Sequence, residues 1–158
     1  MMKALVLGLG NELLGDDGVG ILAARAIKNE ARQLADVYEC NLAGMALLDV
    51  LAGYKYAIIV DAICTGKNEV GAILKIKPED LKSFPCVSPH YAGLPDVITI
   101  ARYLGFKFPD QIVILAIEIE KPLEIGKGLS APITQSLDAL NSVIKKHLYQ
   151  WSGEPSCD

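Results

Sequence analysis

Cysteine patterns typical of a structural zinc site or of a disulfide-stabilised fold are missing from this chain. The four cysteines are too far apart for the CxxC spacing of a structural zinc site; they are Cys40, Cys64, Cys86 and Cys157. A domain of this length buries enough surface to fold without disulfides, so free thiols are expected. Histidine is scarce as well: the sequence contains only His90 and His147.

Long hydrophobic runs are also absent. The most apolar segments, 57–60 and 112–117, are far shorter than the roughly 20 residues that a membrane-spanning helix needs. The apolar stretch between Lys3 and Gly10 is too short for the core of a signal peptide, and polar residues follow it. We therefore expect a soluble, cytoplasmic protein that does not contact a membrane.

Positive charge is not in excess. Lysine and arginine total 15 against 19 aspartates and glutamates, a formal net charge of −4. A nucleic-acid interface needs clustered lysine and arginine, and the only dense basic run is 145–147. We expect no nucleic-acid partner, and cations are the favoured polar ligands.

Apolar residues are plentiful enough for one ordinary domain. The hydrophobic fraction of 51% excludes a chain too polar to collapse. No repeat or linker interrupts residues 1–149, which we interpret as a single domain and expect to be monomeric. Residues 150–158 lack apolar periodicity and are expected to form a flexible tail.

Short β-rich runs alternate with segments of helical period along the whole domain. Strands are predicted at 2–8, 37–41, 56–63, 70–76 and 111–120, and helices at 18–35, 44–53, 95–105 and from 130 onward. In 44–53 the predicted inward face carries Met45, Leu48 and Leu51. The run 70–76 has one wetter face, which favours an edge strand. The pattern predicts an α/β fold with three layers: a mostly parallel, twisted sheet of about five strands, flanked by helices on both faces.

The first strand leads into a glycine-rich loop, residues 8–20, that does not suit phosphate. A dinucleotide fingerprint needs glycine where Leu13 stands, and a P-loop needs Lys and Ser or Thr where Asp16 and Asp17 stand. Adjacent carboxylates would repel an anion, so the loop favours a cation. Either aspartate also suits the N-cap of the helix that begins near Gly18.

Two further residues are candidates, because ligands of parallel sheets bind beyond the carboxyl ends of the strands. Asp61 comes directly after a buried run, where a charge must be paired or coordinated, although it could also accept hydrogen bonds from loop amides. His90 lies in a loop marked by Pro89 and Gly93, where a histidine can also be an ordinary loop residue. If the topology holds, Asp17, Asp61 and His90 converge, and two carboxylates with one imidazole suit zinc or nickel.

These motifs together resemble a known family. The block GNELLGDDGVG, the segment AGMALLDVL, the strand ending IIVDAI and the loop SPHYAGLPDV are similar to those of the hydrogenase maturation endopeptidases. The resemblance places the three metal-contacting positions of the family on Asp17, Asp61 and His90. The chain departs from the family at 40–42, where Cys-Asn-Leu replaces an Asp-Gly-Gly-like turn that many relatives carry.

The resemblance implies a specific activity. Members of this family remove the C-terminal extension from the large-subunit precursor of nickel-iron hydrogenases. The nickel carried by that precursor serves as the recognition element, and no organic cofactor is implied. Asp17, Asp61 and His90 would then contact the nickel of the substrate, and Asp16 is our candidate for the general base that activates water.

Three alternatives stay open at the level of sequence. Cys86, Cys64 or Ser88 would serve a nucleophilic mechanism, although none has an evident base beside it. A phosphoacceptor receiver domain would use Asp16 with Asp17, Asp61 and Lys121. In a receiver domain, however, the acidic pair comes directly after the first strand, whereas eight residues, 8–15, intervene here. A nickel carrier without peptidase activity would use the same three residues as the peptidase.

Overall fold

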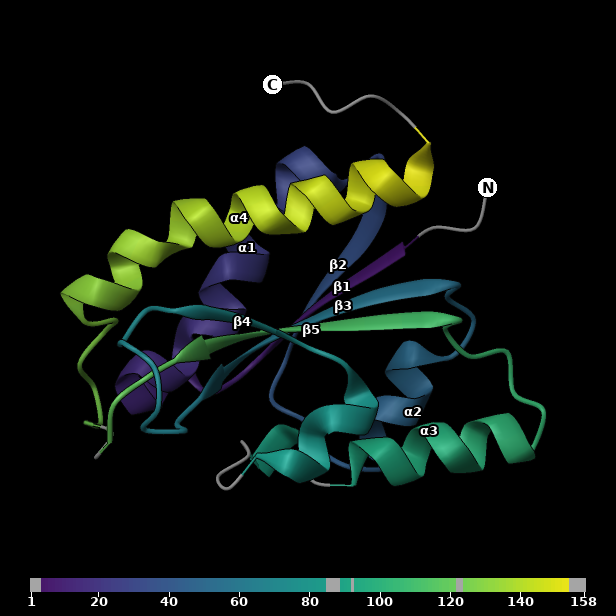
Figure 1. Cartoon of the computed structure of the whole chain (residues 1–158). Helices are drawn as coiled ribbons and strands as arrows, with labels where there is room; N and C mark the ends of the chain where they lie inside the picture. Colours follow the sequence, from purple (N-terminus) through teal and green to yellow (C-terminus); the bar gives the residue numbers. More distant parts are fainter. Residues whose placement is uncertain (1–3, 85–88, 92, 122–123, 154–158) are drawn as a thin grey trace.

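Five strands form one twisted sheet through the centre of the molecule (Figure 1). The computed structural model describes residues 4–84, 89–91, 93–121 and 124–153. The strands are β1 (Ala4–Leu9), β2 (Ala35–Cys40), β3 (Tyr56–Ile63), β4 (Ile73–Ile76) and β5 (Gln111–Glu118). Their order is β2-β1-β3-β5-β4, with β4 alone antiparallel to its neighbour. The expected mostly parallel sheet of five strands is confirmed, and 70–76 contributes its edge strand.

Helices cover both faces of this sheet. The long helix α4 (Ala131–Ser152) lies with α1 (Val19–Ala31) on one face, and α2 (Ala46–Leu51) lies with α3 (Leu94–Tyr103) on the other (Figure 1). Short 3-10 helices complete the described chain: η1 (Glu12–Gly18), η2 (Pro78–Ser83) and η3 (Pro89–Tyr91). The three-layer α/β architecture is therefore confirmed.

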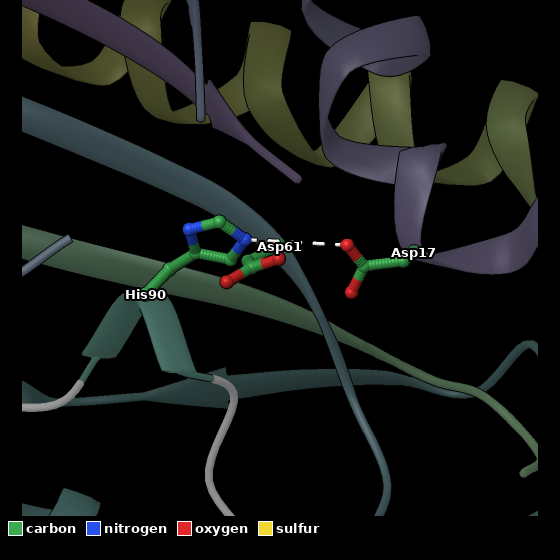
Figure 2. A group of neighbouring side chains, drawn as sticks. All are labelled: Asp17, Asp61 and His90. Atoms are coloured by element: carbon green, nitrogen blue, oxygen red, sulfur yellow. Dashed lines mark ion pairs between the residues drawn. The ribbon is translucent and has the colours of Figure 1, made fainter. Parts of the chain in front are cut away.

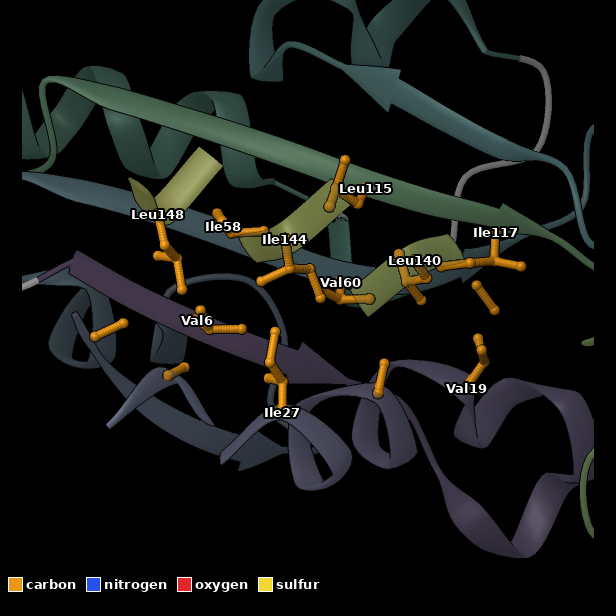
Figure 3. Close-up of a cluster of buried hydrophobic side chains, with 14 of the residues drawn as sticks. Val6, Val19, Ile27, Ile58, Val60, Leu115, Ile117, Leu140, Ile144 and Leu148 are labelled. Atoms are coloured by element: carbon orange, nitrogen blue, oxygen red, sulfur yellow. The ribbon is translucent and has the colours of Figure 1, made fainter. Parts of the chain in front are cut away.

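The strands are apolar on both sides because each side faces a helical layer. Side chains alternate across a strand, so Ile58 of β3 packs in the core shared with α1 and α4, while Ile59 packs in the core shared with α2 and α3. Figure 3 shows the first of these cores, where Ile27 of α1 and Ile144 of α4 approach the strands.

Glycine lets α1 pack directly on the sheet. A Cβ at Gly20 would overlap the backbone carbonyl oxygens of Leu9 and Val60, and a Cβ at Gly8 would overlap the carbonyl of Gly20. Close approach of a helix to strands is a role that only glycine fills without strain. This packing holds the start of α1, and the residues before it, at the carboxyl end of the sheet.

Several expected boundaries and faces differ from the structure. The loop predicted at 8–20 contains η1, and β3 continues two residues beyond Asp61. Met45 precedes the first turn of α2 and is 56% exposed, so its predicted inward position was wrong. Leu51 is fully buried as predicted, together with Leu47. Residues 150–152, expected in a flexible tail, belong to α4, which runs through Ser152; residues 154–158 lie outside the described ranges. No helix in the described part of the chain is both long and apolar enough to span a membrane.

Candidate active site

Asp61 lies near the carboxyl end of the central strand β3. β3 lies between β1 and β5 in the sheet, and Asp61 is 0% exposed. One carboxylate oxygen, Oδ1, accepts a hydrogen bond of 2.7 Å from the backbone N–H of Ala62. A charge at this depth requires polar or ionic partners, so the position points to a ligand or hydrogen-bonding role.

Asp17 reaches the same place from η1, which follows β1. The chain turns sharply within this element at Gly15, whose φ of 60° favours glycine. The side chain of Asp17 is 13% exposed, and its Oδ2 accepts a hydrogen bond of 3.0 Å from the backbone N–H of Asn11. The Asn11 side chain in turn accepts from the N–H of Leu13 and caps η1. The loop thus fixes Asp17 through its own backbone.

His90 comes from η3, on the other side of the site. Its Nδ1 lies 3.0 Å from the backbone carbonyl oxygen of Leu42, in the loop after β2. A carbonyl only accepts, so Nδ1 carries the proton of this hydrogen bond. The other ring nitrogen, Nε2, faces the cluster and lies 4.0 Å from Oδ2 of Asp17. Fixing one ring nitrogen with a carbonyl is how proteins commonly orient a histidine that binds metal.

The structure brings these three side chains together. One ligand atom each from Asp17, Asp61 and His90 lies within 4.8 Å of the others, and Figure 2 shows the two carboxylates and the imidazole converging. Two oxygen donors and one nitrogen donor suit borderline divalent ions such as zinc or nickel. Three protein donors leave coordination positions for a substrate or water.

Asp16 is not part of this cluster. Its Oδ1 accepts from the backbone N–H of Ser130 at 2.6 Å, and its Oδ2 accepts from the Ser130 hydroxyl at 2.8 Å. Ser130 is the N-cap of α4. Asp16 therefore joins η1 to α4 through both of its oxygens. Its expected role as the general base stays a prediction. Neither aspartate caps α1, because its N-cap is Gly18 and makes no side-chain hydrogen bond.

Other acidic side chains near this edge are also engaged. Arg25 binds Glu12 through two hydrogen bonds, of 2.8 and 2.9 Å, and these lower the pKa of Glu12. Glu118 accepts from Thr65 and from the backbone of Gly66. Burial raises the pKa of Glu118, but these hydrogen bonds outweigh burial and leave it lowered. Both carboxylates hold loops in place.

Two residues of the site were missed from the sequence. Leu42 acts through its backbone carbonyl, for which no side-chain signal exists. Tyr91 is 2% exposed, and its hydroxyl is buried without a hydrogen-bond partner among the described residues. Burial, and then the charge of Asp61, raise the pKa of Tyr91 well above its ordinary value, so the phenol stays protonated. The sequence feature that could have pointed to Tyr91 is its position directly after His90.

The nucleophile and receiver alternatives receive no support from this geometry. Cys86 and Ser88 lie outside the described residues, and Cys64 is a half-buried free thiol that does not belong to the cluster. A receiver domain has a parallel sheet in the order 2-1-3-4-5, whereas here β4 lies antiparallel at the edge, outside β5. His90 also has no role in a receiver domain.

Fold and site together define an α/β protein in which three side chains that could hold a divalent metal converge at the carboxyl end of the sheet. The family model of the hydrogenase maturation proteases (HycI) matches residues 22–147. The chain belongs to this family and is a peptidase of hydrogenase maturation. The matched range includes Asp61 and His90, and it begins after Asp17.

Individual relatives agree with this assignment. The chain is 31% identical over 148 residues to the hydrogenase 2 maturation protease of Escherichia coli (strain K12), covering 90% of this chain and 89% of the relative. The structure of the hydrogenase maturating endopeptidase HybD from E. coli matches with a TM-score of 0.80 and 28% identity, covering 94% of this chain and 93% of that one. HybD from Thermococcus kodakarensis matches with a TM-score of 0.72 and 26% identity, covering 93% and 99%.

Proposed function

We propose that this peptidase removes the C-terminal extension of a nickel-iron hydrogenase large-subunit precursor after nickel insertion, and that the nickel of the precursor is what it recognises. The convergence of Asp17, Asp61 and His90 within 4.8 Å carries the proposal. Three fixed donors suit an ion that arrives with its remaining ligands already supplied by another protein. That the chain acts as a cytoplasmic monomer without an organic cofactor stays a prediction.

The three side chains would position the substrate. The Nε2 of His90 and the carboxylates of Asp17 and Asp61 contact the nickel of the docked precursor, which places the scissile peptide beside the cluster. Hydrogen bonds from Asn11 to Asp17 and from His90 to Leu42 hold the donors ready before the substrate arrives. The nickel supplies a Lewis acid that polarises the scissile carbonyl.

A carboxylate of the cluster would serve as the base. Asp17 is 9% exposed, whereas Asp61 is 0% exposed, so water reaches Asp17 more readily. Asp17 accepts a proton as water attacks the carbonyl carbon, and it returns the proton to the amine nitrogen when the C–N bond breaks. Asp16 is not used, since Ser130 occupies both of its oxygens.

The proposal is tested by incubating the protein with nickel-loaded and nickel-free precursor and measuring the shortened product by mass spectrometry. Only the loaded precursor should be cleaved. Asp61→Asn, which keeps the size of the side chain, should slow cleavage by about 100-fold or more. Asp138→Asn, an exposed position on α4, is the matched control and should cleave normally.

Two outcomes would contradict the proposal in different ways. Equal cleavage of nickel-free precursor would remove nickel recognition but keep the peptidase. Loss of nickel from the precursor without a shortened product would instead favour the nickel carrier, which shares the same three donors.

A further inference from the structure

The edge strand β4 is too short to cover its neighbour. Its pairing with β5 runs from Ile73 opposite Ile117 to Ile76 opposite Ile114. β5 begins at Gln111, three residues before this pairing. Of the described strands, only β3 pairs with Gln111, Ile112 and Val113, and it lies on the side away from β4. Within the described chain, the amino end of β5 therefore has an open edge, where backbone N–H and C=O groups can pair with a further strand.

A hollow of about 710 Å³ lies along this open edge. It is bordered by η2 and by α3 from one layer and by the last turns of α4 from the other. Ile112, Val113 and Trp151 contribute apolar surface to its lining. Asp61 pairs in register with Ala116, three residues beyond Val113, which is roughly 10 Å along the strand. The hollow is thus separate from the candidate active site.

Positive charge gathers around the hollow although the chain is acidic overall. Lys75, Lys77, Lys82 and Arg102 line it, together with Glu79 and Asp110. Lys82 pairs with Asp96 at 3.8 Å, but Lys75, Lys77 and Arg102 make no ion pair in the part of the chain that the structure describes. Burial, and then the charges of Lys75 and Lys146, lower the pKa of the nearby His147, which is consistent with a positive potential there.

We propose that this hollow, defined by the open edge of β5 and the cations Lys75, Lys77 and Arg102, binds an extended acidic segment of a partner protein as an added strand. Strand addition supplies backbone hydrogen bonds to Gln111–Val113, and acidic side chains of the added strand meet the unpaired cations. A second copy of this chain is a poor occupant, because edge-to-edge pairing would bring the same lysines together. The site is independent of the cleavage reaction.

Binding is measured by fluorescence polarisation with a labelled, end-blocked peptide of alternating valine and glutamate, which has one acidic and one apolar face as a strand. The double variant Lys75→Glu, Lys77→Glu should bind at least about tenfold more weakly, since attraction becomes repulsion. The matched control is Lys28→Glu, Lys67→Glu, which makes the same change in net charge at exposed positions outside the hollow. It should bind within about twofold of the wild type. Equal weakening in both double variants would overturn the proposal, since the effect would then come from net charge alone.

The mode of binding is measured by amide hydrogen exchange. Strand addition should slow exchange at residues 111–113 when the peptide is present. Trp151 is the only tryptophan, so its fluorescence gives an independent readout in unlabelled protein. Unchanged exchange at 111–113, or full displacement of the peptide by millimolar inorganic phosphate, would overturn the proposal and indicate a small-anion site instead.

Discussion

Asp16 and Asp17 are adjacent in the sequence but have separate roles. Asp17 points to Asp61 and His90, whereas Asp16 binds the N-cap residue of α4 with both carboxylate oxygens. An N-cap residue whose hydroxyl and backbone N–H are both satisfied by a carboxylate anchors the start of its helix. At the scale of single residues, one carboxylate holds the scaffold together and its neighbour belongs to the candidate active site.

This division predicts the effect of Asp16→Ala. The variant should lower the free energy of unfolding by about 1–2 kcal/mol, because hydrogen bonds to a charged group are lost. Cleavage by the remaining folded protein should change by less than about threefold, whereas loss of a general base would cost about 100-fold or more. Urea denaturation and the cleavage assay measure the two effects.

Ser130→Ala provides the matching control. It removes the hydroxyl partner of Asp16, so the double variant should be less destabilised than the sum of the two single variants. A large loss of cleavage by Asp16→Ala with unchanged stability would restore Asp16 as the base.

At the scale of elements, the contact between α1 and the sheet depends on the absence of a side chain at Gly20. In an open helix, replacing glycine by alanine stabilises by up to about 1 kcal/mol. Here the added Cβ would overlap the carbonyl oxygens of Leu9 and Val60, which belong to backbone and have little room to move. The helix would have to shift away from both strands.

Gly20→Ala should therefore destabilise the protein by about 1–3 kcal/mol or more, as overpacking does in a filled core. The midpoint of urea denaturation measures this change. Gly128→Ala is the control, because nothing lies within 4 Å of a Cβ at that position and its φ is not in the left-handed region. Stability of Gly20→Ala equal to that of the wild type would mean that α1 packs less closely than described.

At the scale of the whole molecule, the two apolar cores share the same strands. Ile58 and Ile59 are adjacent in β3, yet they belong to different cores on opposite faces of the sheet. Losing one helical layer would expose a whole apolar face of β1, β3 and β5 to water. The stability of each helical layer therefore depends on the same strands as the other layer. The molecule should unfold as one unit.

Trp151 allows this cooperativity to be measured. Its ring stacks on Tyr56 of β3 with centroids 4.9 Å apart, and its Nε1 donates to Gln111 of β5 at 3.0 Å. Tryptophan fluorescence thus reports the docking of α4, while far-ultraviolet circular dichroism reports all elements. The two urea transitions should coincide. An earlier fluorescence transition would show that α4 detaches before the sheet unfolds.

The sequence by itself determined the order and type of the strands and α-helices, but not the short 3-10 helices, and it singled out the candidate site residues. Hydrophobic period is a local property, so the strands, helices and edge strand could be predicted from short windows. Asp17 and Asp61 were also predictable, because residues at the carboxyl ends of parallel strands meet at one edge of the sheet. His90 was predictable as a histidine in a loop before a helix.

Only the tertiary structure decided how these side chains are used. The bond from Ser130 to Asp16 joins residues 114 positions apart, and that from His90 to Leu42 joins residues 48 apart. Such contacts depend on the path of the chain and on backbone carbonyls, which leave no local pattern. The open edge of β5 likewise arises from where β4 ends against it. Local periodicity sets the elements, but long-range packing sets which groups meet.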